Sequence, residues 1–103
     1  MTNAAADVYP ISTASGRAGR PIFFGYNGYG PSDASTALAI TPNGRTVYEL
    51  AYSPINGGPG AVMPISTSTN AIGSPIAVGP DPYMIVIARD GRTGYVIDQV
   101  GNP

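Results

Sequence analysis

The sequence repeats itself, and this repeat constrains the fold more than any other feature. Residues 8–13 (VYPIST) return 54 residues later as 62–67 (VMPIST). Residues 43–48 (NGRTVY) return 47 residues later as 90–95 (DGRTGY). The two spacings differ by seven residues, so the first copy carries an insertion, which we place within 26–33. A unit that recurs at this period is typically one supersecondary structure that buries its apolar face against the next copy.

Each copy contains four short segments that the pattern predicts as strands. The chain has 14 Gly and 11 Pro, and this density of helix breakers excludes long helices. The dipeptides at 43–44 (NG) and 90–91 (DG) predict tight hairpins with positive φ at both turn residues. The Pro in each of the segments 8–13 and 62–67 predicts a strand near an edge, or one whose pairing starts after the Pro. The eight predicted strands are 8–13, 21–24, 37–41, 46–52, 62–67, 75–78, 83–88 and 93–98.

Four antiparallel strands in a period of about 47 residues are typical of a β-propeller blade. We therefore expect an all-β chain that forms a single propeller-repeat unit over residues 1–103. A full blade spans about 37–79. The last two strands of a split blade lie at about 8–25, and the first two strands of a split blade lie at about 83–98.

The residues of the full blade resemble the YVTN-type β-propeller repeat. The matching stretches are 39–48 (AITPNGRTVY), 62–70 (VMPISTSTN) and 73–82 (GSPIAVGPDP). This resemblance covers nearly the whole chain and implies a propeller fold. It also implies a surface-associated scaffold or interaction module, with an extracellular or cell-surface location. The sequence departs from the family pattern at Glu49, which replaces an apolar residue, and at Arg89, which replaces a Pro.

The composition excludes several classes of function. The chain has no His and no Cys, which removes imidazole and thiol nucleophiles and His/Cys metal sites, and we expect no cofactor. Its net charge is −1 and its five cations are scattered, so we expect no nucleic-acid partner. No apolar run approaches the roughly 20 residues that span a membrane. The N-terminal residues lack the basic start and apolar segment of a secretion signal.

Two blade equivalents cannot close a propeller, which has about 4–8 blades. The two ends of the chain are complementary, because the C-terminal strands of one copy can complete the blade that the N-terminal strands of another begin. We therefore expect a homo-oligomer that assembles head to tail into a closed ring, with a trimer or tetramer favoured. The alternatives are a fragment of a longer propeller and a compact eight-stranded sandwich.

The candidate binding residues are tyrosines in Gly-rich loops. Tyr26, Asn27 and Tyr29 lie in the insertion, and Tyr52 precedes a second Gly-rich loop over 53–60. Tyrosine offers contact area and a hydroxyl at low entropic cost, so these loops suit a small ligand or a glycan. Alternatively, the same side chains cap loops or pack against neighbouring blades. A non-catalytic interaction module is thus the favoured function, and a carbohydrate-binding or small-ligand-binding ring is the second.

A carboxylate-based hydrolase is a distant third hypothesis. Glu49 aligns with Val96 and Asp98 aligns with Ala51, so the two carboxylates stand in equivalent strands of different blades, and we do not expect them to face one another across a cleft. Asp81 and Asp90 are predicted turn residues. No EF-hand-like loop supports a Ca²⁺ site. The six carboxylates of the chain are Asp7, Asp33, Glu49, Asp81, Asp90 and Asp98.

Overall fold

The structure is a computed structural model that describes residues 6–24, 30–31, 38–52 and 58–99. Over these residues the only regular elements are β-strands, all paired antiparallel, which confirms the predicted all-β class. All eight predicted segments contain β-structure. The strands are β1 (Ala6–Val8), β2 (Ile22–Phe24), β3 (Gly30–Pro31), β4 (Leu38–Ile40), β5 (Thr46–Tyr52), β6 (Ala61–Ser66), β7 (Ile76–Ala77), β8 (Pro82–Ile87) and β9 (Gly94–Asp98).

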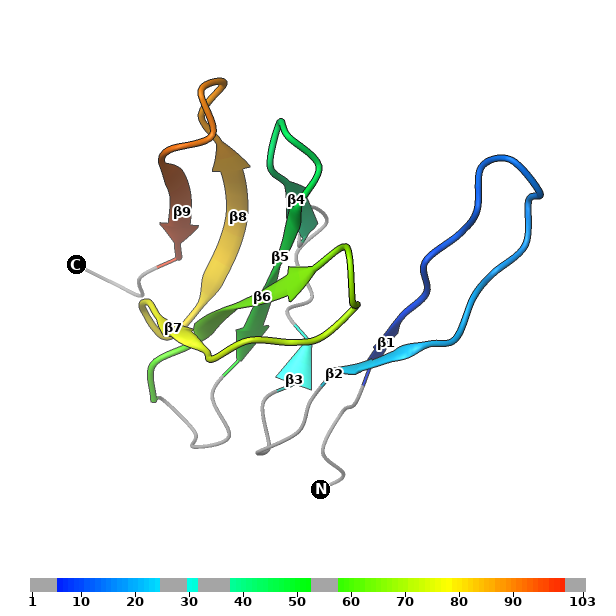
Figure 1. The fold of residues 1–103 in the computed structure, drawn as a ribbon. Helices are drawn as coiled ribbons and strands as arrows, with labels where there is room; N and C mark the ends of the chain where they lie inside the picture. The colour runs from blue at the N-terminus through cyan, green and yellow to red at the C-terminus, as the bar shows by residue number, and fades with distance from the viewer. Residues whose placement is uncertain (1–5, 25–29, 32–37, 53–57, 100–103) are drawn as a thin grey trace.

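The central sheet is a meander in which β4, β5, β6 and β7 pair in sequence order. The β1–β2 hairpin and the β8–β9 hairpin form separate two-stranded sheets on opposite sides of it (Figure 1). A ninth strand, β3, comes from the predicted insertion, where the sequence indicated only a loop. It pairs with the end of β5, beside β4, with Gly30 opposite Tyr52.

The β1–β2 and β6–β7 hairpins have the same hydrogen-bonded register. Val8 lies opposite Ile22, as Val62 lies opposite Ile76, and both pairs are related by the 54-residue spacing. The turns also match: the amide of Ser12 donates to the carbonyl of Arg17, and the equivalent bond joins Ser66 and Ala71, both at 2.9 Å. The repeat is therefore conserved in backbone geometry as well as in sequence.

The β4–β5 and β8–β9 hairpins match in the same way, at the 47-residue spacing. Ala39 lies opposite Tyr48, as Val86 lies opposite Tyr95. In the first turn the amide of Gly44 donates to the carbonyl of Thr41 at 2.8 Å, and the second turn repeats this bond at the same length.

The prediction of positive φ at both turn residues is wrong. Only the Gly of each turn has positive φ, at 75° for Gly44 and 76° for Gly91. The hairpin loop is longer than two residues, and loops of that length are built around an ordinary type I turn. The side chain of Asn43 instead accepts a hydrogen bond from the amide of Arg45 at 2.9 Å, as Asp90 does from Arg92 at 3.0 Å.

Of the two alternatives predicted for the Pro-containing strand, a position near an edge agrees with β6, which lies next to the edge strand β7, whereas pairing that starts only after the Pro is wrong. This strand pairs with β5 on both sides of Pro64 and also with β7. The amide of Thr67 donates to the carbonyl of Arg45, and alternate residues donate to the same neighbour, so the nitrogen of Pro64 faces away from β5. Pro64 therefore removes a donor only on the β7 side, where the ladder is short.

The central sheet buries side chains on both faces. The face that carries Tyr48, Leu50 and Val62, which we call the β8 face, packs against Ile85 of β8 and Val96 of β9. The opposite face, which we call the Glu49 face, carries Glu49, Ala51 and Met63 and includes a small cluster with Ile72. Side chains on both faces of the central sheet are therefore shielded from solvent.

Gly60, just before β6, lies against the segment that links β7 to β8. There is no room for a side chain at this position. The amide of Gly60 donates to the carbonyl of Gly79 at 2.8 Å, and its carbonyl accepts from the amide of Val78 at 3.0 Å. A Cβ atom on Gly60 would lie 2.7 Å from Cδ of Pro82 and 2.8 Å from the carbonyl oxygen of Ala51. Backbone atoms cannot move aside as a flexible side chain can, so only glycine fits.

We expect Gly60→Ala to lower the free energy of unfolding by about 2–3 kcal/mol, the upper range for an overpacked core. Urea unfolding, followed by circular dichroism, measures this loss. Gly19→Ala is the matched control, because its Cβ would meet its nearest atom at an ordinary 3.4 Å. Equal stability of the two variants would contradict the steric argument.

Candidate functional site

The predicted tyrosine site lies mostly outside the described residues. Tyr26, Asn27 and Tyr29 belong to segments that the structure does not describe, and so do residues 53–57 of the second loop. Tyr52 ends β5, with its backbone opposite Gly30. The ligand-binding role of these four residues therefore remains a prediction.

The two carboxyl groups weighed for catalysis point away from one another. Val96 packs against the β8 face of the central sheet, and Asp98 lies two residues later on the same face of β9. Glu49 projects from the opposite face of that sheet. The sheet therefore separates the two side chains, and they do not form the facing pair that glycoside hydrolysis needs.

Asp98 stabilises the corner before β8 instead. Its Oδ1 accepts a hydrogen bond from the amide of Asp81 at 2.9 Å. A Cβ atom on Gly79 would fall in the space of the Asp98 carboxyl group, so a side chain at position 79 would displace that group. The amide of Gln99 donates to the carbonyl of Asp81 at 2.8 Å and closes the corner.

We expect Asp98→Ala to cost about 1–3 kcal/mol of unfolding free energy, because it leaves the part-buried amide of Asp81 without its acceptor. Asp98→Asn keeps an acceptor oxygen at the same position and should retain most of the stability. Thermal unfolding of the two variants and the parent chain makes the comparison. An alanine variant as stable as the parent would show that this bond contributes nothing.

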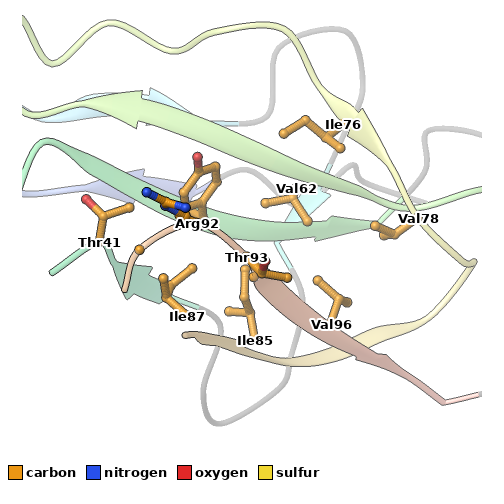
Figure 2. Close-up of a pocket in the computed structure, with 12 residues that line it drawn as sticks. Thr41, Val62, Ile76, Val78, Ile85, Ile87, Arg92, Thr93 and Val96 are labelled. Carbon is orange, nitrogen blue, oxygen red and sulfur yellow. The ribbon is translucent and has the colours of Figure 1, made fainter. Parts of the chain in front are cut away.

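A pocket of about 260 Å³ lies between the β8 face of the central sheet and the β8–β9 hairpin. Figure 2 shows its apolar walls, which include Val62, Ile85 and Val96, and its polar end, where Thr41 and Arg92 lie. Ile76 and Val78 line the far end. Such a pocket suits an apolar side chain or a small apolar group.

The described residues that line this pocket include no carboxyl, imidazole or thiol side chain. Its polar lining consists of hydroxyl groups, the Arg92 side chain and backbone. No group of three or more acidic, His or Cys side chains that could hold a metal ion occurs among the described residues. Over the same part of the chain, no helix is long and apolar enough to cross a membrane.

Large apolar side chains are exposed at the two ends of the repeat. On β9, Tyr95 and Ile97 are 60% and 53% exposed, whereas Leu50, the equivalent of Ile97 in β5, is fully buried. On β4, Leu38 and Ile40 are exposed, whereas Ile85, the equivalent of Leu38, is buried. Each exposed side chain thus stands where its repeat equivalent packs against a neighbouring sheet.

The same contrast occurs on the β1–β2 hairpin. Tyr9 and Ile11 are 54% and 63% exposed, and their equivalents Met63 and Ile65 are 0% and 2% exposed. The sequence comparison did not single out these side chains. The alignment of the two copies contained the relevant signal. An apolar residue in the first or last strands of the chain is a candidate contact residue when its repeat equivalent lies in the core.

Comparison of the chain with protein-family models, with curated proteins and with solved structures finds no match. The resemblance to the YVTN-type repeat is therefore carried by the quoted residues alone. The class that the structure defines is an all-β, antiparallel chain built from an internal repeat.

Proposed function

We propose that the chain is a non-catalytic structural module whose copies assemble head to tail into a closed β-propeller ring. In this arrangement β9 of one copy lies beside β1 of the next, as β5 lies beside β6 within one chain. The two partial sheets then form one four-stranded blade. The observation that carries the proposal is the exposure, at both ends, of apolar side chains whose repeat equivalents are buried.

The packing within one chain is the pattern for the proposed contact between copies. Leu50, Val62 and Ile85 form a buried cluster where β5, β6 and β8 meet. Their equivalents are Ile97, Val8 and Leu38. Ile97 of one copy, docked beside Val8 of the next, covers Leu38 of that next copy and rebuilds the same cluster.

The strand edges support the same arrangement. Among the described residues, β9 pairs with β8 alone and β1 pairs with β2 alone. An unpaired edge is a template for further pairing, and closure of a ring removes such edges. Assembly thus satisfies both the exposed apolar side chains and the backbone donors and acceptors of the two edges.

Two blade equivalents per chain set the size of the ring. Three or four copies give six or eight blades, within the range of closed propellers. The resemblance to the YVTN-type repeat supports an interaction module as a fold-level analogy. A ring also presents its surface loops once per chain, which suits multivalent binding.

Light scattering after size exclusion, across a dilution series, tests the proposal. We expect a single mass of three or four chains of 10.5 kDa each, unchanged on dilution. A monomer at every concentration would overturn the assembly. A mass that grows continuously with concentration would replace the closed ring by an open filament.

A further inference from the structure

We infer that the apolar pocket beside β9 binds the side chains of Tyr9 and Ile11 from a second copy of this chain. The inference rests on the proposed head-to-tail assembly and adds to it the strand register and the occupant of the pocket. Three observations lead to it: the register between β5 and β6, the alternation of side chains on β9, and the exposure of Tyr9 and Ile11.

The register follows from the pairs within one chain. Glu49 lies opposite Met63, and Val47 lies opposite Ile65. Each residue of β5 has its repeat equivalent 47 residues later, in or next to β9. Each residue of β6 has its repeat equivalent 54 residues earlier, in β1 or just after it. Replacing the residues of each pair by these equivalents gives the pairs expected between two copies. Val96 then lies opposite Tyr9 of the second copy, and Gly94 lies opposite its Ile11.

The faces of the strands direct these side chains into the pocket. Gly94 and Val96 both line it, and residues directly opposite on an antiparallel pair project from the same face of the sheet. Tyr9 and Ile11 of the incoming strand therefore project into the same pocket. Gly94 has no side chain, whereas its equivalent is Val47, so the pocket has extra room opposite Ile11.

The pocket also matches these side chains in chemistry. Its walls are aliphatic, and Thr41, Tyr48 and Arg92 supply polar groups to its lining. Ile11 matches the aliphatic walls, and Tyr9 combines an apolar ring with a hydroxyl group that can reach a polar partner. In the isolated chain both side chains are more than half exposed, so docking removes a large apolar area from water.

The turn of the second copy supplies a further contact. Within one chain, the hydroxyl of Thr67 donates to the carbonyl of Gly44 at 2.6 Å, and its amide donates to the carbonyl of Arg45 at 2.9 Å. The equivalent residues are Thr13, Gly91 and Arg92, and none of the three has changed residue type. Thr13 of the second copy thus bonds to the β8–β9 turn and fixes the register.

A disulfide bond tests the register. Thr46 and Ser66 face one another as a non-hydrogen-bonded pair of β5 and β6. The Cα atoms of such a pair are about 4.5 Å apart, which is within the range that a disulfide bond spans. The equivalent pair between copies is Thr93 and Ser12. The chain has no Cys, so Thr93→Cys with Ser12→Cys introduces the only two thiols.

Without reductant, this double variant should form disulfides between chains, seen as a ladder on a denaturing gel that ends at the number of chains in the ring. Thr46→Cys with Ser66→Cys is the positive control, which should close within one chain. Thr93→Cys with Ala14→Cys shifts one thiol by two residues, and we expect at least tenfold less cross-linked product.

A charge in the pocket tests the occupant. Ile11→Lys should weaken assembly at least tenfold, because Arg92 lines the pocket and no acidic side chain among the described residues does, whereas Ala14→Lys, which adds the same charge at the exposed turn of the same hairpin, should not. Ile11 is exposed in the single chain, so its replacement leaves the fold intact, as circular dichroism would verify. An oligomer that persists in Ile11→Lys, or that cross-links through position 14, overturns this inference but not the assembly. A monomeric parent chain overturns both.

Discussion

Ile97→Lys is expected to convert the assembled protein into a monomer of one chain mass. Ile97 stands where Leu50 is fully buried between β5, β6 and β8. In the proposed contact the new ammonium group would be enclosed by Val8 and Leu38 of the next copy, without a partner. An unpaired buried charge costs about 3–5 kcal/mol, which weakens the contact by more than about a hundredfold. Light scattering at micromolar concentration measures the change in mass.

The control for this variant is Thr69→Lys. It adds the same charge on the exposed turn between β6 and β7, away from both ends of the repeat. The parent mass should survive this change. If Ile97→Lys remained as large as the parent protein, β9 would not be the contacting strand.

A charge-reversal partner tests the contact from its other side. Leu38→Glu alone should also give a monomer, because Leu38 is the residue that Ile97 of the preceding copy contacts in the proposed assembly. In a mixture of Ile97→Lys and Leu38→Glu chains that alternate around a ring, each contact is either a Lys–Glu pair or the parent pair. A ring of four closes in this way, whereas a ring of three leaves one mismatched contact. Recovery of a tetramer on mixing would therefore support the contact and the even number of chains together.

The positions of the strands were predictable because they depend on local signals. Prolines, glycines and short apolar runs mark the ends of β5 and β9 within one residue of the observed ends. The 54-residue and 47-residue spacings also indicated which hairpins share a strand register, because similar sequences adopt similar registers. The turns were less predictable, because a dipeptide such as Asn43-Gly44 fits both a two-residue loop and the longer loop observed.

The functional features depend on contacts that no local pattern contains. The pocket is formed by residues from the central sheet and from the β8–β9 hairpin, and it becomes visible only once these are packed together. The role of Asp98 at the corner likewise depends on a residue 17 positions away. Glu49 carried a signal, because its repeat equivalent is Val96, yet the sequence could not show how deeply it is buried.

The largest effect within a single chain is expected from the pH dependence of Glu49. Its side chain is only 7% exposed, and its Oε1 has no hydrogen-bond partner among the described residues. Burial removes the carboxylate from water and raises the pKa of Glu49 from 4.5 to about 7. The folded chain therefore holds this proton more tightly than the unfolded chain does. Stability is highest below pH 4.5 for this group and falls as the pH rises through 7, by up to about 3 kcal/mol in total.

Glu49→Gln isolates this contribution, since it keeps the shape of the side chain and cannot ionise. We expect the variant to match the parent near pH 4.5 and to exceed its unfolding free energy at pH 8 by up to about 3 kcal/mol. Urea unfolding at both pH values, at one fixed chain concentration, makes the measurement. Glu49→Val, which installs the residue of the other copy, should behave in the same way at pH 8. A parent chain whose stability rises between pH 5 and 8 relative to both variants would contradict a neutral, buried Glu49, because it would require a carboxylate stabilised by the fold.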